Sequence, residues 1–392
     1  MLLNLAIPAA GRKFFRRFSR NALAVAVTLT AFPTLTLAQA NEGDRIVLSG
    51  SDILNLTVSG QINRGLLVVD DGEDTTLLNV DNNNSSSRIR FIAETKPVEG
   101  WVAGAAYETE FRLNNSASLS QLDEDVNDTS AFRNRRVEVY FSHGDLGKLW
   151  LGQGWTATEG VSENDLSGTS VAGYSDVTVL GGGILFRDKA TNTLTGTDLG
   201  DVAANLDGFG RNTRLRYDTP TFNGLQFRTS VINDGALDAG LWYNGQHDRL
   251  KVAAGLGWGN TSELSATPTY DDQLSGSLSV LDASGVSVTL AAGQADAIDS
   301  SKDDLKFTYV KLGYQASWFP NVGKTALSVD WQQTDDKDQN GDTVDVIGAQ
   351  AVQKIDVIGT EVYGSVRSVS LDRNGVDYED NLLALVGARI RF

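Results

Sequence analysis

Apolar and polar residues alternate in about sixteen separate stretches of this chain, and the connectors between them are alternately short and long. From Leu250 to Trp258 every second residue is apolar, with Lys251 and glycines among the residues between. Alternation with period two indicates a β-strand with one apolar and one polar face. Such strands, joined by tight turns on one side and long loops on the other, are typical of a closed antiparallel transmembrane β-barrel. We therefore predict an all-β fold.

The sixteen predicted strands are 56–69, 87–96, 100–113, 131–142, 148–155, 211–218, 224–233, 238–246, 249–259, 272–281, 285–295, 305–318, 324–334, 345–354, 358–370 and 381–392. The short connectors are rich in Gly, Pro, Asn and Asp, which favour turn geometry. The long connectors are 70–86, 114–130, 156–210, 260–271, 296–304, 335–344 and 371–380. An even number of strands places both ends of the barrel on the tight-turn side, which is periplasmic in such barrels.

The first forty residues have the pattern of a secretory signal peptide. Residues 22–37 are apolar, Ala38-Gln39-Ala40 fits a cleavage site, and the preceding basic residues are Arg12, Lys13, Arg16, Arg17 and Arg20. A transmembrane anchor is the alternative, but the apolar run is short and is interrupted by threonines and Pro33. We predict that 1–40 is removed and that 41–392 forms the barrel.

Charge and composition exclude several functional classes. Removal of 1–40 takes away five of the 33 basic residues and none of the 50 acidic ones, so the remaining 352 residues carry a net charge of −22. Strong negative charge argues against nucleic-acid binding. The chain has no cysteine, so disulfides and thiolate metal sites are excluded. No segment after residue 40 holds the ~20 apolar residues that a membrane helix needs.

Four short segments, in their order and spacing, carry a resemblance to a known family. They are Ser87-Arg88-Ile89-Arg90-Phe91, the segment 146–153 (LGKLWLGQ), the segment 215–224 (LRYDTPTFNG) and the terminal segment 386–392 (VGARIRF). With the strand layout, they make the chain similar to the general, non-specific trimeric porins of the Gram-negative outer membrane. The resemblance implies a homotrimer embedded in outer-membrane lipid and lipopolysaccharide, which passes small hydrophilic solutes and ions passively, without catalysis or an organic cofactor. It also implies that the barrel assembly machinery recognises the terminal aromatic residue, Phe392.

The resemblance assigns a role to segment 156–210, because porins of this family fold their third loop into the lumen to narrow the pore. The candidate pore-facing carboxylates of this loop are Glu159, Glu163, Asp165 and Asp176. The family places a basic cluster on the facing wall, and the matching residues are Arg88, Arg90, Arg136, Arg214 and Arg216. Arg136 is expected to share a face with Asn134 and Glu138. Opposed charges across a narrow aqueous gap would set the selectivity of the pore. The second part of the segment, about 187–210, has no predicted place.

The acidic long loops would attract cations to the pore mouth, whereas the arginines would oppose them. We therefore expect a mild preference for cations. The segment from Asp336 to Asp342 suggests a calcium loop, because oxygen-bearing side chains alternate and a glycine supplies the turn. Its candidate ligands are Asp336, Asp338, Asn340 and Asp342. The alternative is an acidic turn, because Ile347 stands where a calcium loop needs glutamate.

Three other functions remain as alternatives. A barrel enzyme would need a general base, and the two histidines, His143 and His247, both fall in predicted periplasmic turns without an obvious serine partner. A surface β-protein, such as an adhesin or a carbohydrate-binding domain, could also use alternating strands. A substrate-specific channel would share the barrel and differ in the geometry of its loops, which the sequence does not give.

Overall fold

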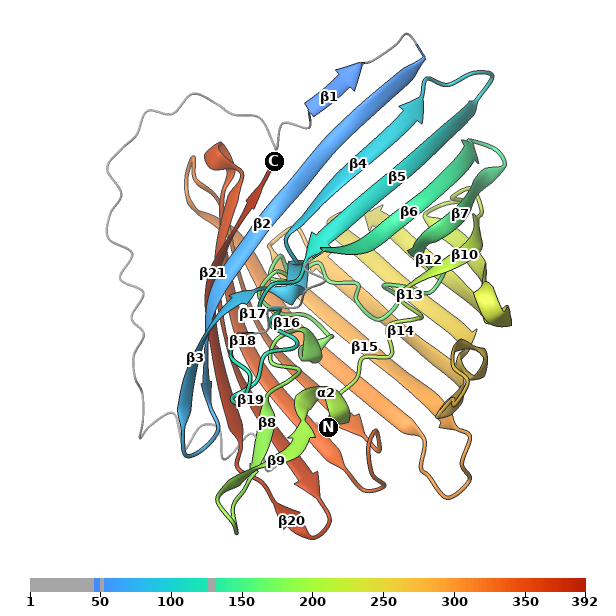
Figure 1. Ribbon diagram of the computed structural model, residues 1–392. Helices are drawn as coiled ribbons and strands as arrows, with labels where there is room; N and C mark the ends of the chain where they lie inside the picture. The colour runs from blue at the N-terminus through green and yellow to red at the C-terminus, as the bar shows by residue number, and fades with distance from the viewer. Residues whose placement is uncertain (1–45, 50–52, 126–131) are drawn as a thin grey trace, which may run out of the picture.

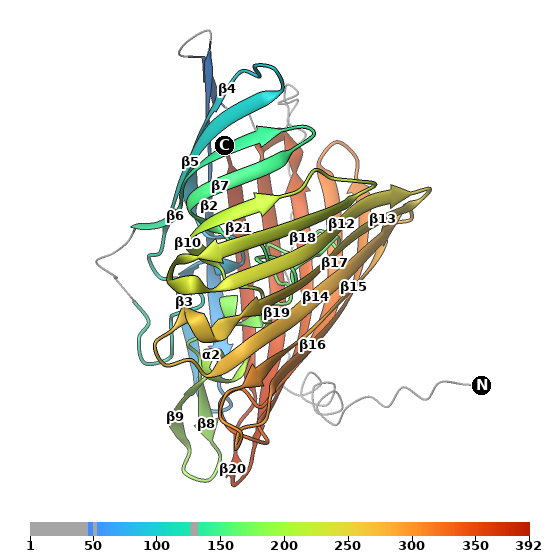
Figure 2. The ribbon, with the colours of Figure 1, turned by 90° about the vertical axis from the view of Figure 1, so that its right-hand side faces the viewer.

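Sixteen antiparallel strands close into a barrel in the computed structural model, which describes residues 46–49, 53–125 and 132–392. Figures 1 and 2 show the tilted strands of the barrel wall from two sides. The predicted signal peptide, 1–40, lies outside the described residues. The prediction of an all-β barrel of sixteen strands is confirmed.

The barrel strands follow the chain order and agree with the predicted ranges to within a few residues. They are β2 (Leu54–Asp70), β4 (Arg88–Thr95), β5 (Trp101–Phe111), β6 (Phe132–His143), β7 (Gly147–Trp155), β10 (Arg211–Asp218), β11 (Leu225–Ile232), β12 (Leu237–His247), β13 (Leu250–Asn260), β14 (Tyr270–Asp282), β15 (Val286–Ala297), β16 (Leu305–Phe319), β17 (Gly323–Asp335), β18 (Thr343–Ile355), β19 (Thr360–Arg373) and β21 (Asn381–Arg391). Short pieces flank them: β1 (Ile46–Ser49), β3 (Thr75–Asp81), β20 (Val376–Asp377) and the 3-10 turns Asn83–Ser85, Asn233–Gly235, Thr261–Leu264 and Asp356–Ile358.

The barrel closes between its first and last strands. Gln61 of β2 lies opposite Arg391 of β21, and the pairing continues to Asp70 opposite Leu382. Phe392 and Gly60 then exchange two backbone hydrogen bonds, of 2.7 and 3.0 Å. A closed barrel satisfies backbone hydrogen bonds between strands, as a bilayer requires. Closure also excludes the sandwich or solenoid of the surface-protein alternative.

The two faces of the sheet differ as the alternation predicts. On β14 the side chains of Leu274 and Leu278 are exposed, whereas Ser275, Ser277 and Ser279 are buried. Exposed apolar and buried polar residues are the reverse of the usual distribution in a soluble protein. The apolar face is therefore the outer, lipid-facing surface, and the polar face lines the barrel interior. Within the described residues, no helix is both long and apolar enough to span a membrane.

The second strand of the barrel is broken into β3 and β4, both of which pair with β2. The predicted loop 70–86 thus contains a strand that the sequence pattern missed. Between the two pieces lies the polar run 82–87 (NNNSSS), in which the Asn82 side chain accepts a hydrogen bond from the backbone of Asn84. Asn and Ser stabilise turns with such side-chain contacts, so the composition explains the break.

The segment 156–210 contains a 3-10 turn (Val177–Val179), the hairpin of β8 (Leu185–Asp188) and β9 (Thr193–Asp198), and the one-turn helix α2 (Leu199–Val202). The hairpin lies beside the loops around β2 and β20, because Arg187 pairs with Asp71 at 2.9 Å and Lys189 with Asp377 at 2.8 Å. Figure 1 shows β8, β9 and β20 at the end of the barrel opposite the C-terminus. This is the long-loop end, so residues 187–198, left unplaced by the sequence, belong to the extracellular mouth.

Over part of the area where segment 156–210 covers the inner face of the barrel wall, the inward-facing side chains are apolar instead of polar. Leu67, Val69, Val344, Leu383 and Leu385 have exposed fractions of 1% or less and belong to one buried cluster. Loop residues of that cluster include Val171, Val177, Leu180, Ile184 and Phe186. Where lipid covers one face of a strand and apolar loop residues cover the other, the sequence reads as a continuous apolar run, as in Leu66–Val69. The main apolar core thus lies between the wall at β2, β18, β19 and β21 and the loop.

Candidate functional site

The segment 156–210 is held to the polar face by hydrogen bonds from several strands. Lys311 of β16 donates to Asp165 and to the carbonyl of Gly173, both at 2.7 Å. Further contacts to loop carbonyls include those from Ser277 on β14 (Val161, 2.6 Å), Gln332 on β17 (Ala204, 2.8 Å) and Arg367 on β19 (Val177, 3.1 Å). These contacts place the loop along one half of the wall and leave β4, β5 and β6 on the other.

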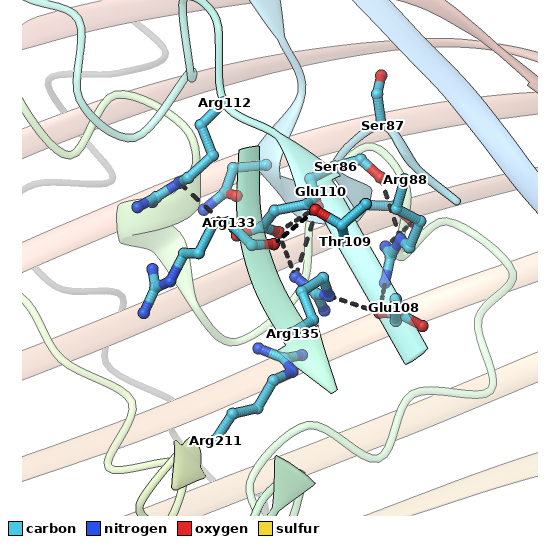
Figure 3. Close-up of polar contacts among 12 residues, drawn as sticks. Ser86, Ser87, Arg88, Glu108, Thr109, Glu110, Arg112, Arg133, Arg135 and Arg211 are labelled. Atoms are coloured by element: carbon cyan, nitrogen blue, oxygen red, sulfur yellow. Dashed lines mark hydrogen bonds and ion pairs between the residues drawn. The ribbon is translucent and has the colours of Figure 1, made fainter. Parts of the chain in front are cut away.

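A cluster of arginines occupies that second half (Figure 3). Three guanidinium groups surround the buried carboxylate of Glu108: Arg90 in direct contact, Arg135 at 2.6 Å and Arg88 at 3.8 Å. Arg135 also pairs with Glu110, which lies 3.7 Å from Arg112. Arginines therefore outnumber the carboxylates that they share, and this part of the wall carries net positive charge.

A β-bulge on β6 brings two consecutive arginines to the same face. Glu108 of β5 lies opposite Arg136, but the next residue, Thr109, lies opposite Asn134. The extra residue, Arg135, reaches Glu108 and Glu110, and Arg136 donates to Glu138 at 2.5 Å. Bulges re-aim side chains in this manner. The expectation that Asn134 shares a face with Arg136 is wrong because of this bulge, and Arg135 is a cluster residue that the sequence reading missed.

The other predicted basic residues are firmly bound to the wall. Arg214 is 2% exposed and donates to Glu138 (2.5 Å) and to the carbonyls of Gly152 (3.0 Å) and Trp155 (2.8 Å). Arg216 pairs with Asp218 at 2.7 Å and donates to the carbonyl of Thr156 at 3.0 Å. These two arginines thus brace the start of the loop against β10.

The four predicted loop carboxylates have different partners. Glu159 lies 3.7 Å from Arg211 of β10, and Glu163 accepts a hydrogen bond from Asn205 at 3.1 Å. Asp165 is bound to Lys311, and Asp176 caps the 3-10 turn that begins at Val177. Asp207, which the sequence reading missed, accepts hydrogen bonds from the backbone of Gly160 (2.9 Å) and Ser162 (3.2 Å). Burial and the carboxylates of Asp207 and Glu159 raise the pKa of Glu163 well above its usual value.

The raised pKa of Asp207 gives a pH-dependent charge on the loop. Burial, followed by the Glu159 carboxylate, raises the pKa of Asp207 to about 7. An acid whose pKa is higher in the folded than in the unfolded chain binds its proton preferentially in the folded state. We expect the loop to lose negative charge, and the folded state to gain stability, as the pH falls through about 7.

Reversal potentials under a salt gradient, measured on both sides of that pH, check this expectation. Cation preference should weaken at the lower pH in the wild type, and Asp207→Asn should show a smaller step. A wild-type potential that does not change across this range would contradict the assignment.

The carboxylates of the predicted calcium loop already have a cationic partner. The Arg373 guanidinium donates to Asp338 (2.6 Å) and Asp342 (2.8 Å). Asp336 accepts from the backbone of Gly341 at 2.7 Å, and Asn340 contacts Ser301 and Asp303 of the neighbouring loop. Among the described residues, no group of three or more His, Cys, Asp or Glu is arranged to hold a metal. The segment is an acidic turn paired with arginine.

The two histidines lie at the tight-turn end, as expected from their positions. His143 is the last residue of β6, and its Nδ1 accepts the backbone N–H of Asp145 at 3.2 Å. His247 is the last residue of β12 and contacts the Tyr243 hydroxyl.

A closed sixteen-stranded barrel with an apolar exterior and a charged interior defines an outer-membrane channel. Residues 22–374 match the model of the family described as Gram-negative porin. The chain belongs to this family of outer-membrane diffusion channels.

Solved structures of several outer-membrane proteins are similar in fold. An anion-selective porin from Comamonas acidovorans is 17% identical, with a TM-score of 0.57 over 86% of this chain and 100% of that chain. OmpF of Salmonella typhi, solved with daunomycin, is 14% identical, with a TM-score of 0.56 over 88% and 100%. The trimer form of Vibrio cholerae OmpT is 15% identical, with a TM-score of 0.53 over 86% and 99%. No curated protein matches the sequence.

Proposed function

We propose that the chain passes small hydrophilic solutes and ions passively, through a lumen narrowed by segment 156–210. The observation that carries the proposal is the opposition of charges: the arginine cluster of β4 to β6 lies on one wall, and the loop carries Glu159, Glu163, Asp176 and Asp207. The 3.7 Å contact between Glu159 and Arg211 of β10 joins the loop to the wall beside this cluster (Figure 3). A transverse field of this kind orients dipolar solutes and penalises apolar ones.

We propose a mild preference for cations. The net charge of −22 without residues 1–40, and the acidic extracellular loops, would concentrate cations at the mouth. The arginine cluster opposes them inside the lumen. The family and the trimer form of Vibrio cholerae OmpT support a homotrimer, surrounded by lipid and lipopolysaccharide and inserted by the barrel assembly machinery through recognition of Phe392.

Single-channel recording in planar bilayers under a salt gradient tests the proposal. Conductance that closes in groups of three supports open trimeric pores, and the sign of the reversal potential gives the selectivity. A correctly folded barrel without conductance would refute passive diffusion.

A matched pair of double variants tests which arginines set the selectivity. Arg88→Gln/Arg211→Gln should raise the cation-to-anion permeability ratio at least about fivefold, since even one unit charge about 4 Å from an ion contributes about 1 kcal/mol in water. Arg214→Gln/Arg216→Gln removes the same charge from side chains that are already bonded to the wall, so it should change the ratio less and lower stability more. Equal shifts in both variants would contradict this division.

A substrate-specific channel is the second candidate. It is favoured by the apolar cluster and the β8–β9 hairpin, which occupy part of the extracellular half of the barrel. A low conductance that one class of solute blocks at millimolar concentration would favour it.

A further inference from the structure

Basic side chains lie on aromatic rings along the polar face of β6, β7, β11 and β12. The Lys148 ammonium is 3.7 Å from the ring centroid of Tyr140 and 3.8 Å from that of Trp150. The Arg228 guanidinium is 4.3 Å from the ring centroid of Trp242. Arg136 lies 5.7 Å from the Trp150 ring and links this region to the arginine cluster above. We call Arg136, Tyr140, Lys148, Trp150, Arg228 and Trp242 the periplasmic strip.

The strip carries more positive than negative charge. Within the described residues, Lys148 and Arg228 form no ion pair, whereas Arg136 and Arg214 share Glu138, and Arg216 is paired with Asp218. The Tyr140 hydroxyl donates to Glu94 at 2.5 Å. Counting these two neighbouring arginines, Arg214 and Arg216, five basic groups lie in or beside the strip among three carboxylates, an excess of two. A ring face holds a cation in place without neutralising it, so this excess charge remains available to an anion in the lumen.

A pocket of about 320 Å³ lies at the tight-turn end of the strip. Its lining includes Lys148, the hydroxyl-bearing residues Ser142, Thr219 and Thr221, and the apolar side chains of Val102 and Pro220. Arg228 is linked to this pocket through Gln226, which accepts its Nε hydrogen bond at 2.8 Å and also lines the pocket. The site thus combines unpaired positive charge, hydroxyl donors and an apolar surface. Pockets that bind small ligands commonly have such a lining, in which a few polar groups on an apolar surface fix the ligand.

We propose that the strip and its pocket bind small organic anions, namely carboxylates that carry a flat apolar group, between the constriction and the periplasm. The carboxylate contacts Lys148 and the hydroxyl groups, and the apolar group contacts Val102 and Pro220. This inference deepens the proposed function, because such solutes reach the strip through the open lumen. It also adds a reason why the preference for cations is mild: the strip offsets the acidic loops.

Equilibrium binding of benzoate to the refolded trimer in detergent tests the proposal without requiring conduction. Isothermal titration should show saturable benzoate binding and at least about tenfold weaker binding of benzamide, its uncharged analogue, since hydrogen bonds to charged groups exceed neutral ones in strength. Lys148→Gln/Arg228→Gln should weaken benzoate binding about tenfold or more. Lys251→Gln/Lys324→Gln is the matched control, because it removes two exposed lysines from the same end of the barrel, away from the pocket.

Heat-modifiable electrophoretic mobility first verifies that every variant is folded. The inference would be overturned if benzamide and benzoate bound equally, or if no saturable binding were seen. It would also be overturned if Lys148→Gln/Arg228→Gln left the affinity for benzoate unchanged, or if the control variant lost as much affinity. Failure of the proposed function is a separate result. Folded protein that binds benzoate but conducts no current would refute passive diffusion alone. A conducting channel that does not bind benzoate would refute only the anion site on the strip.

Discussion

Replacing Lys311 by methionine is expected to loosen the long loop and to raise the conductance and the current noise of the channel. The Lys311 side chain is 0% exposed and forms a 2.7 Å ion pair with Asp165, whose side chain is 4% exposed. Removing one partner of a buried pair costs about 3–5 kcal/mol because the other charge is left without compensation. The strand ladders of the wall remain intact, so we expect the loop near Asp165 to detach from β16 rather than the barrel to unfold.

Single-channel recording and the temperature of the heat-induced mobility shift measure the two consequences. Lys306→Met is the control, because it makes the same change at an exposed position of the same strand. Adding Asp165→Asn to Lys311→Met should restore much of the wild-type conductance, since no charge is then left buried. If Lys311→Met and Lys306→Met conduct alike, this ion pair does not hold the loop in place.

Replacing Glu108 by glutamine should shift the reversal potential toward anions and destabilise the barrel wall. The Glu108 side chain is 0% exposed and is the shared partner of Arg88, Arg90 and Arg135. Glutamine keeps the size of the side chain but removes the charge that offsets three guanidinium groups, so their repulsion becomes uncompensated. We expect a loss of about 3–5 kcal/mol in the free energy of unfolding, as for other broken buried pairs.

Glu124→Gln provides the matched control for this variant, since it removes one negative charge from an exposed residue outside the barrel strands. Only the Glu108 variant should change both the reversal potential and the stability. Equal, small shifts in the two variants would mean that the arginine cluster does not control the ions that pass.

The strand layout could be predicted because lipid and water impose a simple pattern on every strand. The predicted strand 211–218 has the bounds of β10, and 249–259 differs from β13 by one residue at each end. The tryptophans near strand ends do not all have the same environment. Trp101, Trp258 and Trp318 are exposed near strand ends, as aromatic girdles require. Trp155, also at a strand end, instead lies against Arg136 and Arg211, with 5.3 and 5.5 Å between guanidinium carbon and ring centroid.

The bulge at Arg135 is visible in the sequence as a shift in the alternation of apolar residues along β6. Phe132 is exposed on the outer face, and so are Val137 and Val139, so the apolar face changes from even to odd residue numbers within β6. An extra residue between Phe132 and Val137 is the simplest cause of that change. Reading the shift would have predicted that Arg135 joins the polar face.

The course of the long loop could not be predicted, because distant contacts determine it. Arg187 meets Asp71 across 116 residues of sequence, and Lys311 meets Asp165 across 146. Local composition does not specify such partners. The arginine partner of the predicted calcium loop is a further case: Arg373, which binds the carboxylate of Asp342, lies 31 residues beyond it, on β19.

The closure of the barrel between β2 and β21 has a consequence for how the molecule folds. The closing contacts join residues far apart in the sequence, and the Tyr363–Asn63 hydrogen bond spans 300 residues. Such distant pairings carry a large loop-closure entropy and slow the folding of a chain. Before they form, β2 and β21 both present unpaired edges, which are templates for pairing with another chain. Closure within one molecule therefore competes with association between molecules. Because only association depends on concentration, correct folding should be most efficient at low protein concentration.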